Sequence, residues 1–362
     1  MKILIACDKF KGSLSSLEVA AAVQRGFGEG FAFDPCPLAD GGEGFVSAMM
    51  GAMGGEAIEC ESVDALDRPI TTSYGLSGQT AVIEMAAASG LWRIEEEVRD
   101  VLAASSYGTG LLMKDAMERG ATKILLGLGG SATNDGGAGA AAALGWRFTG
   151  SGGLDFERPT PDKLAALEAV DSSAVGHLPR IEVACDVENP LFGARGATAI
   201  YGPQKGAGPE EREFLEATLH RLVETAGGAD LAEIPGAGAA GGMGWGLMKF
   251  AGATLRPGFD LVADAVGLRE RIQAADVVIT GEGSLDGQSL EGKGPVGLAR
   301  MAREEGKRVL ALAGRITPEV RDCGLFEEMA ALDETGLPLA ELMARAEELT
   351  EEAARSLAGR LM

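Results

Sequence analysis

The feature that most constrains the fold of this chain is an apolar run that leads directly into a glycine-dense polar turn and then into an alanine-rich segment. These three parts occupy residues 123–128, 129–137 and 138–144. A short apolar run bounded by turn residues predicts a buried strand, and an alanine-rich segment favours helix. The stretch therefore predicts a strand, a tight turn and a helix, a combination typical of α/β folds.

The polar side chains of this central turn (residues 129–137) make it a candidate ligand site. A glycine-rich turn before a helix leaves backbone N–H groups at the helix N-terminus, where the partial positive charge favours an anion such as a phosphate. The side chains can add hydrogen bonds, and a carboxylate can contact Mg²⁺; the candidates are Gly130, Ser131, Thr133, Asn134 and Asp135. The same pattern is typical of a purely structural turn in which Asn134 or Asp135 caps the helix.

Two loops near the N-terminus combine glycine with charged residues. Residues 8–16 follow a predicted buried strand at residues 2–7 and carry Lys9, Lys11 and Ser13. Ligands of open α/β sheets bind at the carboxyl ends of strands, although a solvated loop that ends in a serine N-cap has the same composition. The next loop carries Asp40 and Glu43 after a strand predicted at residues 32–38.

Three further loops lie in the second half of the chain. Asp186 and Asn189 follow a predicted strand at residues 181–185, where a metal or hydroxyl site and an Asx turn before proline are both plausible. A rigid loop at residues 202–208 contains Gln204 and Lys205. A long loop after the predicted strand at residues 276–280 presents Glu282, Asp286 and Lys293. Among these residues, Asp186, Glu282 and Asp286 are the candidate magnesium ligands, and Lys293 is expected to face a phosphate.

Two motif matches in these loops are incomplete. Residues 236–241 match the dinucleotide pattern GxGxxG, but no buried strand precedes them, which disfavours a nicotinamide site. Residues 287–293 match GxxxxGK, but Gly294 stands where a P-loop has Ser or Thr to hold magnesium. Neither match predicts its usual binding site.

The composition disfavours several classes of function. A net charge of −22 repels nucleic acid and anionic membranes. The five cysteines are dispersed and include no CxxC pair, which indicates buried thiols in a reducing cytoplasm. No segment has the apolar length of a membrane span or a signal peptide. We therefore expect a cytoplasmic protein that works on small molecules through Asp, Glu, Lys, Ser, Thr and Asn.

The length of 362 residues is sufficient for two domains. Residues 59–76 alternate around a turn at 67–69 and predict an antiparallel hairpin, which marks a change from alternating β and α to a mixed sheet. We predict a doubly wound, Rossmann-like α/β domain with a parallel sheet from residues 1–78 and 268–362. The remaining residues, 79–267, are predicted to form an inserted α/β domain with a mixed sheet. One amphipathic helix is expected to close the chain at residues 338–361.

Lysines and carboxylates on glycine-rich loops are the components of phosphoryl transfer, because cations bind phosphate oxygens and carboxylates bind Mg²⁺. In order along the chain, these loops resemble the type-1 glycerate kinase family over nearly the whole sequence. The segments that carry the resemblance are DKFKGSLSS at Asp8, PLADGGEG at Pro37, LGGSATNDGGAG at Leu128, ACDVENPLFG at Ala184, GPQKGA at Gly202, GAGAAGG at Gly236 and GEGSLDGQSLEGK at Gly281.

This resemblance implies phosphorylation of D-glycerate by ATP and Mg²⁺ at the 2-hydroxyl, in a cleft between a Rossmann-like domain and an inserted α/β domain, by a monomer or homodimer. We expect Asp40 or Asp186 to orient the proton of the substrate hydroxyl, and Lys293 to face the transferring phosphoryl group. Ser284 departs from the family pattern, in which Arg is frequent at this position. The alternatives are a kinase that forms 3-phosphoglycerate, a nicotinamide-dependent oxidoreductase, and a non-catalytic sensor of a small anion.

Overall fold

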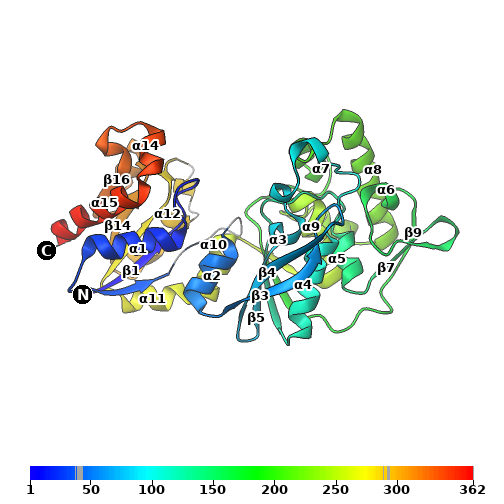
Figure 1. Cartoon of the computed structure of the whole chain (residues 1–362), viewed down its shortest axis with the longest axis horizontal. Helices are drawn as coiled ribbons and strands as arrows, with labels where there is room; N and C mark the ends of the chain where they lie inside the picture. Colours follow the sequence, from blue (N-terminus) through cyan, green and yellow to red (C-terminus); the bar gives the residue numbers. More distant parts are fainter. Residues whose placement is uncertain (37, 39–43, 288, 292–293, 362) are drawn as a thin grey trace. The chain divides into compact units, whose positions relative to one another are not determined.

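Strands from both ends of the chain form one parallel sheet in the computed structural model, which describes residues 1–36, 38, 44–287, 289–291 and 294–361 (Figure 1). The strand order is β16 (Glu328–Ala331), β14 (Arg308–Ala313), β12 (Val277–Gly281), β1 (Lys2–Cys7) and β2 (Ala32–Pro35). Every neighbouring pair runs parallel. The sequence of β1, β12 and β14 is almost continuously apolar because these strands are buried on both faces.

Helices cover both faces of this parallel sheet. On one face, α1 (Ser16–Phe27) packs against α15 (Ala346–Leu361), and the apolar side chains of both helices join a core with the strands. Two other helices contact the same strands without contributing to that core: α11 (Leu268–Ala274) lies against β1, and α12 (Gly294–Glu304) lies against β12 and β14. The parallel sheet is therefore doubly wound, as the sequence predicted.

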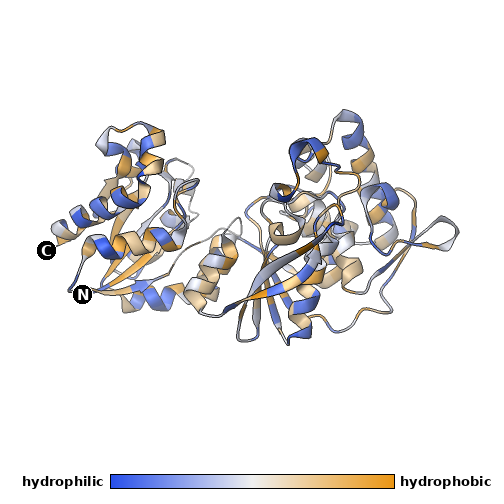
Figure 2. Cartoon of the chain, viewed as in Figure 1, coloured by the Kyte–Doolittle hydropathy of each residue, from blue (hydrophilic) through white to orange (hydrophobic). Residues whose placement is uncertain are grey.

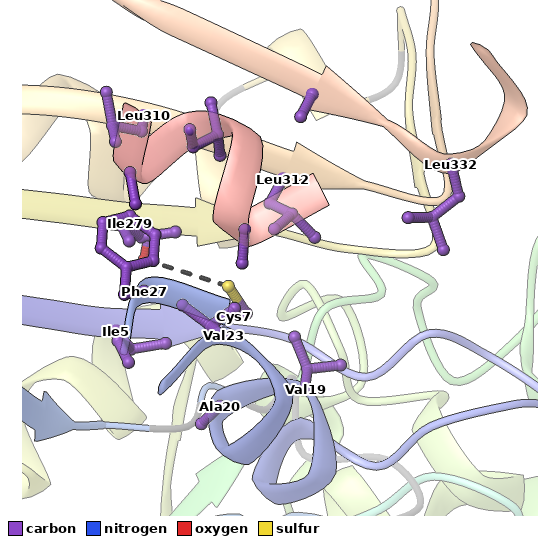
Figure 3. Close-up of a cluster of buried hydrophobic side chains, with 14 of the residues drawn as sticks. Ile5, Cys7, Val19, Ala20, Val23, Phe27, Ile279, Leu310, Leu312 and Leu332 are labelled. Carbon is purple, nitrogen blue, oxygen red and sulfur yellow. Dashed lines mark hydrogen bonds between the residues drawn. The ribbon is translucent and has the colours of Figure 1, made fainter. Parts of the chain in front are cut away.

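The core on the α1 side joins three adjacent strands to one helix. Figure 3 shows Ile5, Ile279 and Leu310 facing Val23 and Phe27 of α1. Each such side chain contributes about 1.5–3 kcal/mol when it is fully buried. Figure 2 shows the resulting pattern, with hydrophobic residues on the strands and hydrophilic residues along the outer side of α15.

Cys7 ends β1 inside this same core. Its thiol donates to the Ile279 carbonyl over 3.9 Å (Figure 3). Burial, together with the negative charge of Asp8, raises the pKa of the Cys7 thiol to about 12. The side chain is therefore a neutral, buried apolar residue at neutral pH.

The middle of the chain forms a six-stranded mixed sheet. Its order is β11 (Thr254–Arg256), β10 (Arg180–Ala184), β6 (Lys123–Gly127), β5 (Thr80–Glu84), β4 (Pro69–Ser77) and β3 (Glu56–Val63). The strands from β11 to β5 are parallel, whereas β3, β4 and β5 form an antiparallel meander. A smaller antiparallel sheet contains β7 (Arg147–Gly150), β8 (Leu154–Asp155) and β9 (Leu167–Asp171).

The remaining elements connect these sheets. Those around the mixed sheet are α3 (Ala86–Ser89), α4 (Tyr107–Glu118), α5 (Ala138–Ala143), α6 (Pro161–Leu164), α7 (Ala197–Tyr201), α8 (Pro209–Ala226) and α9 (Ala239–Ala251), with 3₁₀ turns η1 (Leu91–Arg93), η2 (Glu96–Val98), η3 (Ser151–Gly153), η4 (Pro203–Lys205) and η5 (Ala229–Leu231). Those around the parallel sheet are α2 (Phe45–Met53), α10 (Gly258–Ala265), α13 (Pro318–Arg321), α14 (Leu339–Ala344), η6 (Ser289–Glu291), η7 (Leu332–Thr335) and the paired short strands β13 (Ser284–Leu285) and β15 (Arg315–Ile316).

The chain divides into two compact units. Unit 1 comprises Met1–Asp40, Ser47–Gly54 and Phe259–Met362, and unit 2 comprises Gly41–Val46 and Gly55–Gly258. The boundaries therefore differ from the predicted ones at residues 78 and 268. The hairpin of β3 and β4 pairs with β5 and extends the mixed sheet, so residues 55–78 belong to unit 2.

The predicted closing helix is two helices. α14 ends at Ala344, and α15 begins at Ala346. Arg345 lies between them with φ −110° and ψ 18°, outside helical geometry. The prediction of one continuous helix at residues 338–361 is therefore wrong, since periodicity alone did not reveal this interruption.

Candidate active site

The strand order of unit 1 defines a position where ligands bind in open α/β sheets. From β1 the chain crosses to β2 on one side, and it later returns to β12 on the other side. The order reverses between β1 and β12, and such a switch point leaves a crevice at the carboxyl ends of the strands. Cys7 at the end of β1 is in register with Gly281 at the end of β12. The two loops that follow, residues 8–16 and 282–291, are here called the switch-point loops.

The switch-point loops start in direct contact. The backbone N–H of Asp8 donates to the Gly281 carbonyl over 2.8 Å. A Cβ at Gly283 would lie 3.3 Å from the backbone nitrogen of Lys11, so glycine allows the loops to approach closely. Lys9 is half-buried and Lys11 is exposed. The fold thus brings both predicted lysines to the same sheet edge as the acidic loop.

One serine links the Glu282 carboxylate to the backbone of Asp286 in the acidic switch-point loop. The Ser289 hydroxyl donates to Oε1 of Glu282 over 2.7 Å and accepts from the backbone N–H of Asp286 over 3.2 Å. The Ser284 hydroxyl lies 3.4 Å from Oδ2 of Asp286. All of these side chains are half-buried or exposed. Glu282 and Asp286 are therefore oriented within one loop, at a surface that a ligand can reach.

This pair of carboxylates fits magnesium better than it fits a metal held only by protein. Within the described ranges, no three His, Cys, Asp or Glu side chains are grouped so that they could hold a metal ion. Mg²⁺ is usually bound by one or two carboxylates together with substrate phosphates and water. The third predicted ligand, Asp186, belongs to unit 2 and accepts a 3.0 Å hydrogen bond from the Gly258 backbone N–H.

Several predicted residues contribute to local structure or lie outside the described residues. Ser13 donates its hydroxyl to the Phe10 carbonyl over 3.0 Å and stabilises its own turn. Asp40, Glu43 and Lys293 lie outside the described residues. Gln204 is exposed beside Lys205 on η4.

Asn189 is engaged at both ends of its amide. Its Nδ2 donates to the Arg195 carbonyl, and its Oδ1 accepts from the Tyr201 hydroxyl, both over 2.7 Å. The backbone carbonyl of Asn189 also accepts from the Gly238 N–H over 2.9 Å. Asn189 thus braces the loop after β10 through bonds to Arg195 and Tyr201, which are not those of an Asx turn.

The central turn of unit 2 is closed by hydrogen bonds from its own surroundings. Asp135 is fully buried, and its carboxylate accepts from the backbone N–H groups of Gly137 and Gly139. It also accepts from the backbone N–H and the hydroxyl of Ser106, both over 2.8 Å. Burial raises the pKa of the Asp135 carboxyl, and these hydrogen bonds oppose that shift.

The first backbone amides of α5 are consequently occupied. Besides the two bound by Asp135, the N–H of Gly136 donates to the Gly241 carbonyl and that of Ala140 to the Ser106 hydroxyl. The expectation that these amides hold an external anion is therefore wrong. A protein carboxylate takes the anion's place, which is the capping alternative.

The outer edge of the central turn has a different character. Gly129 and Gly130 are exposed, whereas Ser131, Thr133 and Asn134 are buried. Asn134 donates its amide to the Thr198 hydroxyl over 3.1 Å. Among the described residues, the buried atoms Thr133 Oγ1 and Asn134 Oδ1 have no hydrogen-bond partner, so they are the polar groups of the turn left for water or a ligand.

Two partners of the central turn were not predicted as site residues. Ser106 precedes α4 and reads in sequence as a cap of that helix, yet its hydroxyl serves α5 instead. Gly241 lies in the GxGxxG match, where a Cβ would come within 2.0 Å of the Thr133 carbonyl oxygen. The left-handed φ of +70° at Gly241 also favours glycine. The residues of the GxGxxG match therefore form a loop that packs against the central turn. η5 and a turn precede this loop.

A doubly wound sheet with lysines and paired carboxylates at its switch point is typical of enzymes that act on phosphates. The comparisons with known proteins specify the family. The model of the "Glycerate kinase family" matches residues 3–362. The chain therefore belongs to the glycerate kinase family and is a kinase.

Individual relatives agree over most of their length. The chain is 45% identical to the glycerate 2-kinase of Escherichia coli K12 over 333 residues, which cover 88% of this chain and 87% of the relative. It is 41% identical to the glycerate kinase of Bacillus subtilis 168 over 372 residues, 99% of this chain and 97% of the relative. A crystal structure from Salmonella typhimurium LT2, provisionally called glycerate kinase 2, matches with a TM-score of 0.89 and 41% identity, covering 100% of this chain and 98% of that one. In the described part of this chain, no helix combines the length and apolar character needed to cross a bilayer.

Proposed function

We propose that this kinase transfers the γ-phosphoryl group of ATP to the 2-hydroxyl of D-glycerate and forms 2-phosphoglycerate and ADP. Membership of the glycerate kinase family supports the substrate, and the relative named glycerate 2-kinase supports the position. The observation that carries the proposal is the pair of switch-point loops, which gather Lys9, Lys11, Glu282 and Asp286 at one sheet edge.

Charge explains why this edge suits phosphoryl transfer. The chain as a whole carries a net charge of −22 and would repel a polyphosphate unless cations were gathered locally. Lys9 and Lys11 supply two such cations beside the loop that carries the carboxylates. Lys293, at the end of that same loop in sequence, is the proposed contact to the transferring phosphoryl group.

We further propose that Glu282 and Asp286 hold the Mg²⁺ that accompanies ATP, and we keep Asp186 as the third proposed ligand. Bound Mg²⁺ neutralises charge on the phosphate oxygens. Ser289 orients the Glu282 carboxylate and fixes the backbone of Asp286.

Asp40 and Asp186 are the proposed groups that orient the proton of the substrate hydroxyl. Neither histidine of the chain lies in a glycine-rich loop, so a carboxylate is the available base. The loose transition state of phosphoryl transfer asks little of such a base. The outer edge of the central turn, Gly130 and Ser131, is proposed to contact substrate.

The test is ADP release measured with D-glycerate, ATP and Mg²⁺, followed by NMR of the product. A phosphorus signal coupled to the proton on C2 is expected. Coupling to the C3 protons instead would identify the 3-phosphoglycerate-forming alternative. ADP release that does not depend on glycerate, or a glycerate-dependent change in nicotinamide absorbance, would contradict the proposal. Binding of glycerate without turnover would identify the anion sensor.

A further inference from the structure

We propose that Lys205 and Asp135 are positioning residues that fix the second half of the central turn, and that Lys205 acts through the Thr133 carbonyl instead of through a substrate phosphate. The tests of this inference that measure activity rest on the proposed function, and the structural tests do not. It replaces the expectation that Lys205 binds phosphate, and it assigns a task to the most deeply buried lysine among the described residues.

Lys205 is buried to an extent that a lysine seldom reaches without a dedicated partner. Its side chain is 1% exposed, and its Nζ donates to the Thr133 carbonyl oxygen over 2.6 Å. The two residues are 72 positions apart in sequence, so this bond ties η4 to the central turn. A lysine held in this way is not available at the surface to meet a phosphate.

The charges around Lys205 are few. Burial lowers the pKa of Lys205 to about 7, and the negative charge of Asp135 opposes part of that shift. Two arginines also lie beside η4: Arg99 reaches the Gln204 carbonyl over 3.4 Å, and the stem of Arg212 packs near Gly202. Asp135 is thus the acidic group that acts on the ammonium.

The Thr133 carbonyl is held from a second direction. Gly241 packs so closely that a Cβ there would lie 2.0 Å from the Thr133 oxygen. The Gly241 carbonyl in turn accepts from the Gly136 N–H over 3.1 Å. Three loops that are distant in sequence, carrying Thr133, Lys205 and Gly241, therefore meet at one carbonyl group.

Asp135 holds the turn two residues further on, through its four hydrogen bonds to Ser106, Gly137 and Gly139. The exposed Gly129 and Gly130 lie between the end of β6 at Gly127 and the held Thr133, so they keep one geometry at the surface. A misplacement of about 1 Å in such a positioning element can cost on the order of 10²-fold in rate. This is how buried residues can control a reaction that they do not touch.

The decisive comparison is between Lys205→Gln and Lys205→Met. Glutamine keeps an N–H donor for the Thr133 carbonyl but carries no charge, whereas methionine keeps the length and loses the donor. A positioning role predicts that kcat/KM falls about 10²-fold in Lys205→Met and stays within about tenfold of the parent in Lys205→Gln, well below the melting temperature of each. A phosphate-binding lysine needs its charge, so equal losses in both variants would overturn the proposal. Unchanged activity in both would show a merely structural residue and also overturn it.

Two measurements do not depend on activity, and the second of them uses only the parent protein. First, amide hydrogen exchange of residues 129–139 should accelerate in Lys205→Met relative to Lys205→Gln, while exchange in β1 and β12 stays the same. Second, in the parent protein, an amine-acylating reagent should leave Lys205 unlabelled with or without ATP and glycerate. Labelling of Lys205 that ATP prevents would overturn the proposal. If the parent showed no glycerate-dependent ADP release, the proposed function would fail while both of these measurements would still decide the positioning role.

Discussion

The switch-point loops of unit 1 and the central turn of unit 2 have similar sequences but opposite environments. Both follow a buried strand, and both combine glycines with carboxylates. The side chains of Glu282 and Asp286 are half-buried at a sheet edge, whereas Asp135 is fully buried under hydrogen bonds from Ser106 and the backbone of α5. The same composition thus leaves its carboxylates partly accessible in one unit and binds its carboxylate within the fold in the other.

The difference arises from the segments that pack against each loop in the folded chain. The loops after β1 and β12 lie at the switch-point edge of the sheet, where Lys9, Glu282 and Asp286 are half-buried and Lys11 is exposed. The central turn is instead enclosed by η4 and by the loop around Gly241. A carboxylate in a glycine-rich turn is therefore informative about ligand binding only when its backbone partners are known.

The largest effect is expected from the carboxylates of unit 1. Glu282→Gln and Asp286→Asn should each lower kcat by on the order of 10²-fold, because transition-state charge loses its neutralisation. The rate should also require more Mg²⁺ for saturation. Asp276→Asn is the matched control, since Asp276 lies at the opposite end of β12 and accepts from the Lys2 backbone N–H over 2.7 Å. Parental rates in both test variants, measured across a magnesium titration, would remove this loop from the active site.

A second comparison tests how tightly the central turn is enclosed. Gly241 and Gly78 both have positive φ, but a Cβ at Gly78 meets no atom within 4 Å. Gly78→Ala should cost about 1–2 kcal/mol of unfolding free energy from backbone strain alone. Gly241→Ala should cost about 1–3 kcal/mol more, because the Thr133 carbonyl must move. Urea unfolding of the two variants measures this difference, and equal losses would mean that the close approach carries no cost.

The two carboxylates should also differ in stability. Asp135→Asn replaces a charged acceptor of four hydrogen bonds with an amide that has one acceptor, and leaving buried donors unmet costs about 1–3 kcal/mol. Asp286→Asn should change the unfolding free energy by no more than about 0.5 kcal/mol, as is usual at accessible positions. If thermal melts showed the reverse order, the assignment of structural and ligand-facing roles would be inverted.

The last comparison concerns the pH dependence of stability. The pKa of Lys205 is about 7 in the folded chain, below the ordinary value of 10.5 that the unfolded chain retains. Between these values the unfolded state binds a proton that the folded state lacks, so the parent gains stability as pH rises from about 7 toward 10, by at most about 1.4 kcal/mol per pH unit. Below pH 7 both states are protonated and the slope disappears. Lys205→Met should lack this increment in urea unfolding curves at pH 7, 8 and 9, whereas identical slopes would show that Lys205 titrates normally.

The sequence by itself determined the elements whose causes are local. The apolar runs of β1, β6 and β12 predicted buried strands because a strand that is buried on both faces carries no polar face. Pro209 and Gly227 set the bounds of α8, since proline suits a first helical turn and glycine a helix end. The family motifs predicted the class of reaction. Each of these features lies within a few residues of its cause.

Only the tertiary structure decided which glycine-rich loops present their polar groups and which bury them. Asp135 is bound by Ser106 from 29 residues away, and Lys205 binds a carbonyl 72 residues away. The hairpin at residues 56–77 belongs to the mixed sheet because β4 pairs with β5. This pairing places the boundary of unit 2 earlier in the chain than the sequence predicted. Hydrogen bonds and packing between distant segments depend on how the sheets bring their loops together. No local pattern in the sequence encodes these tertiary contacts.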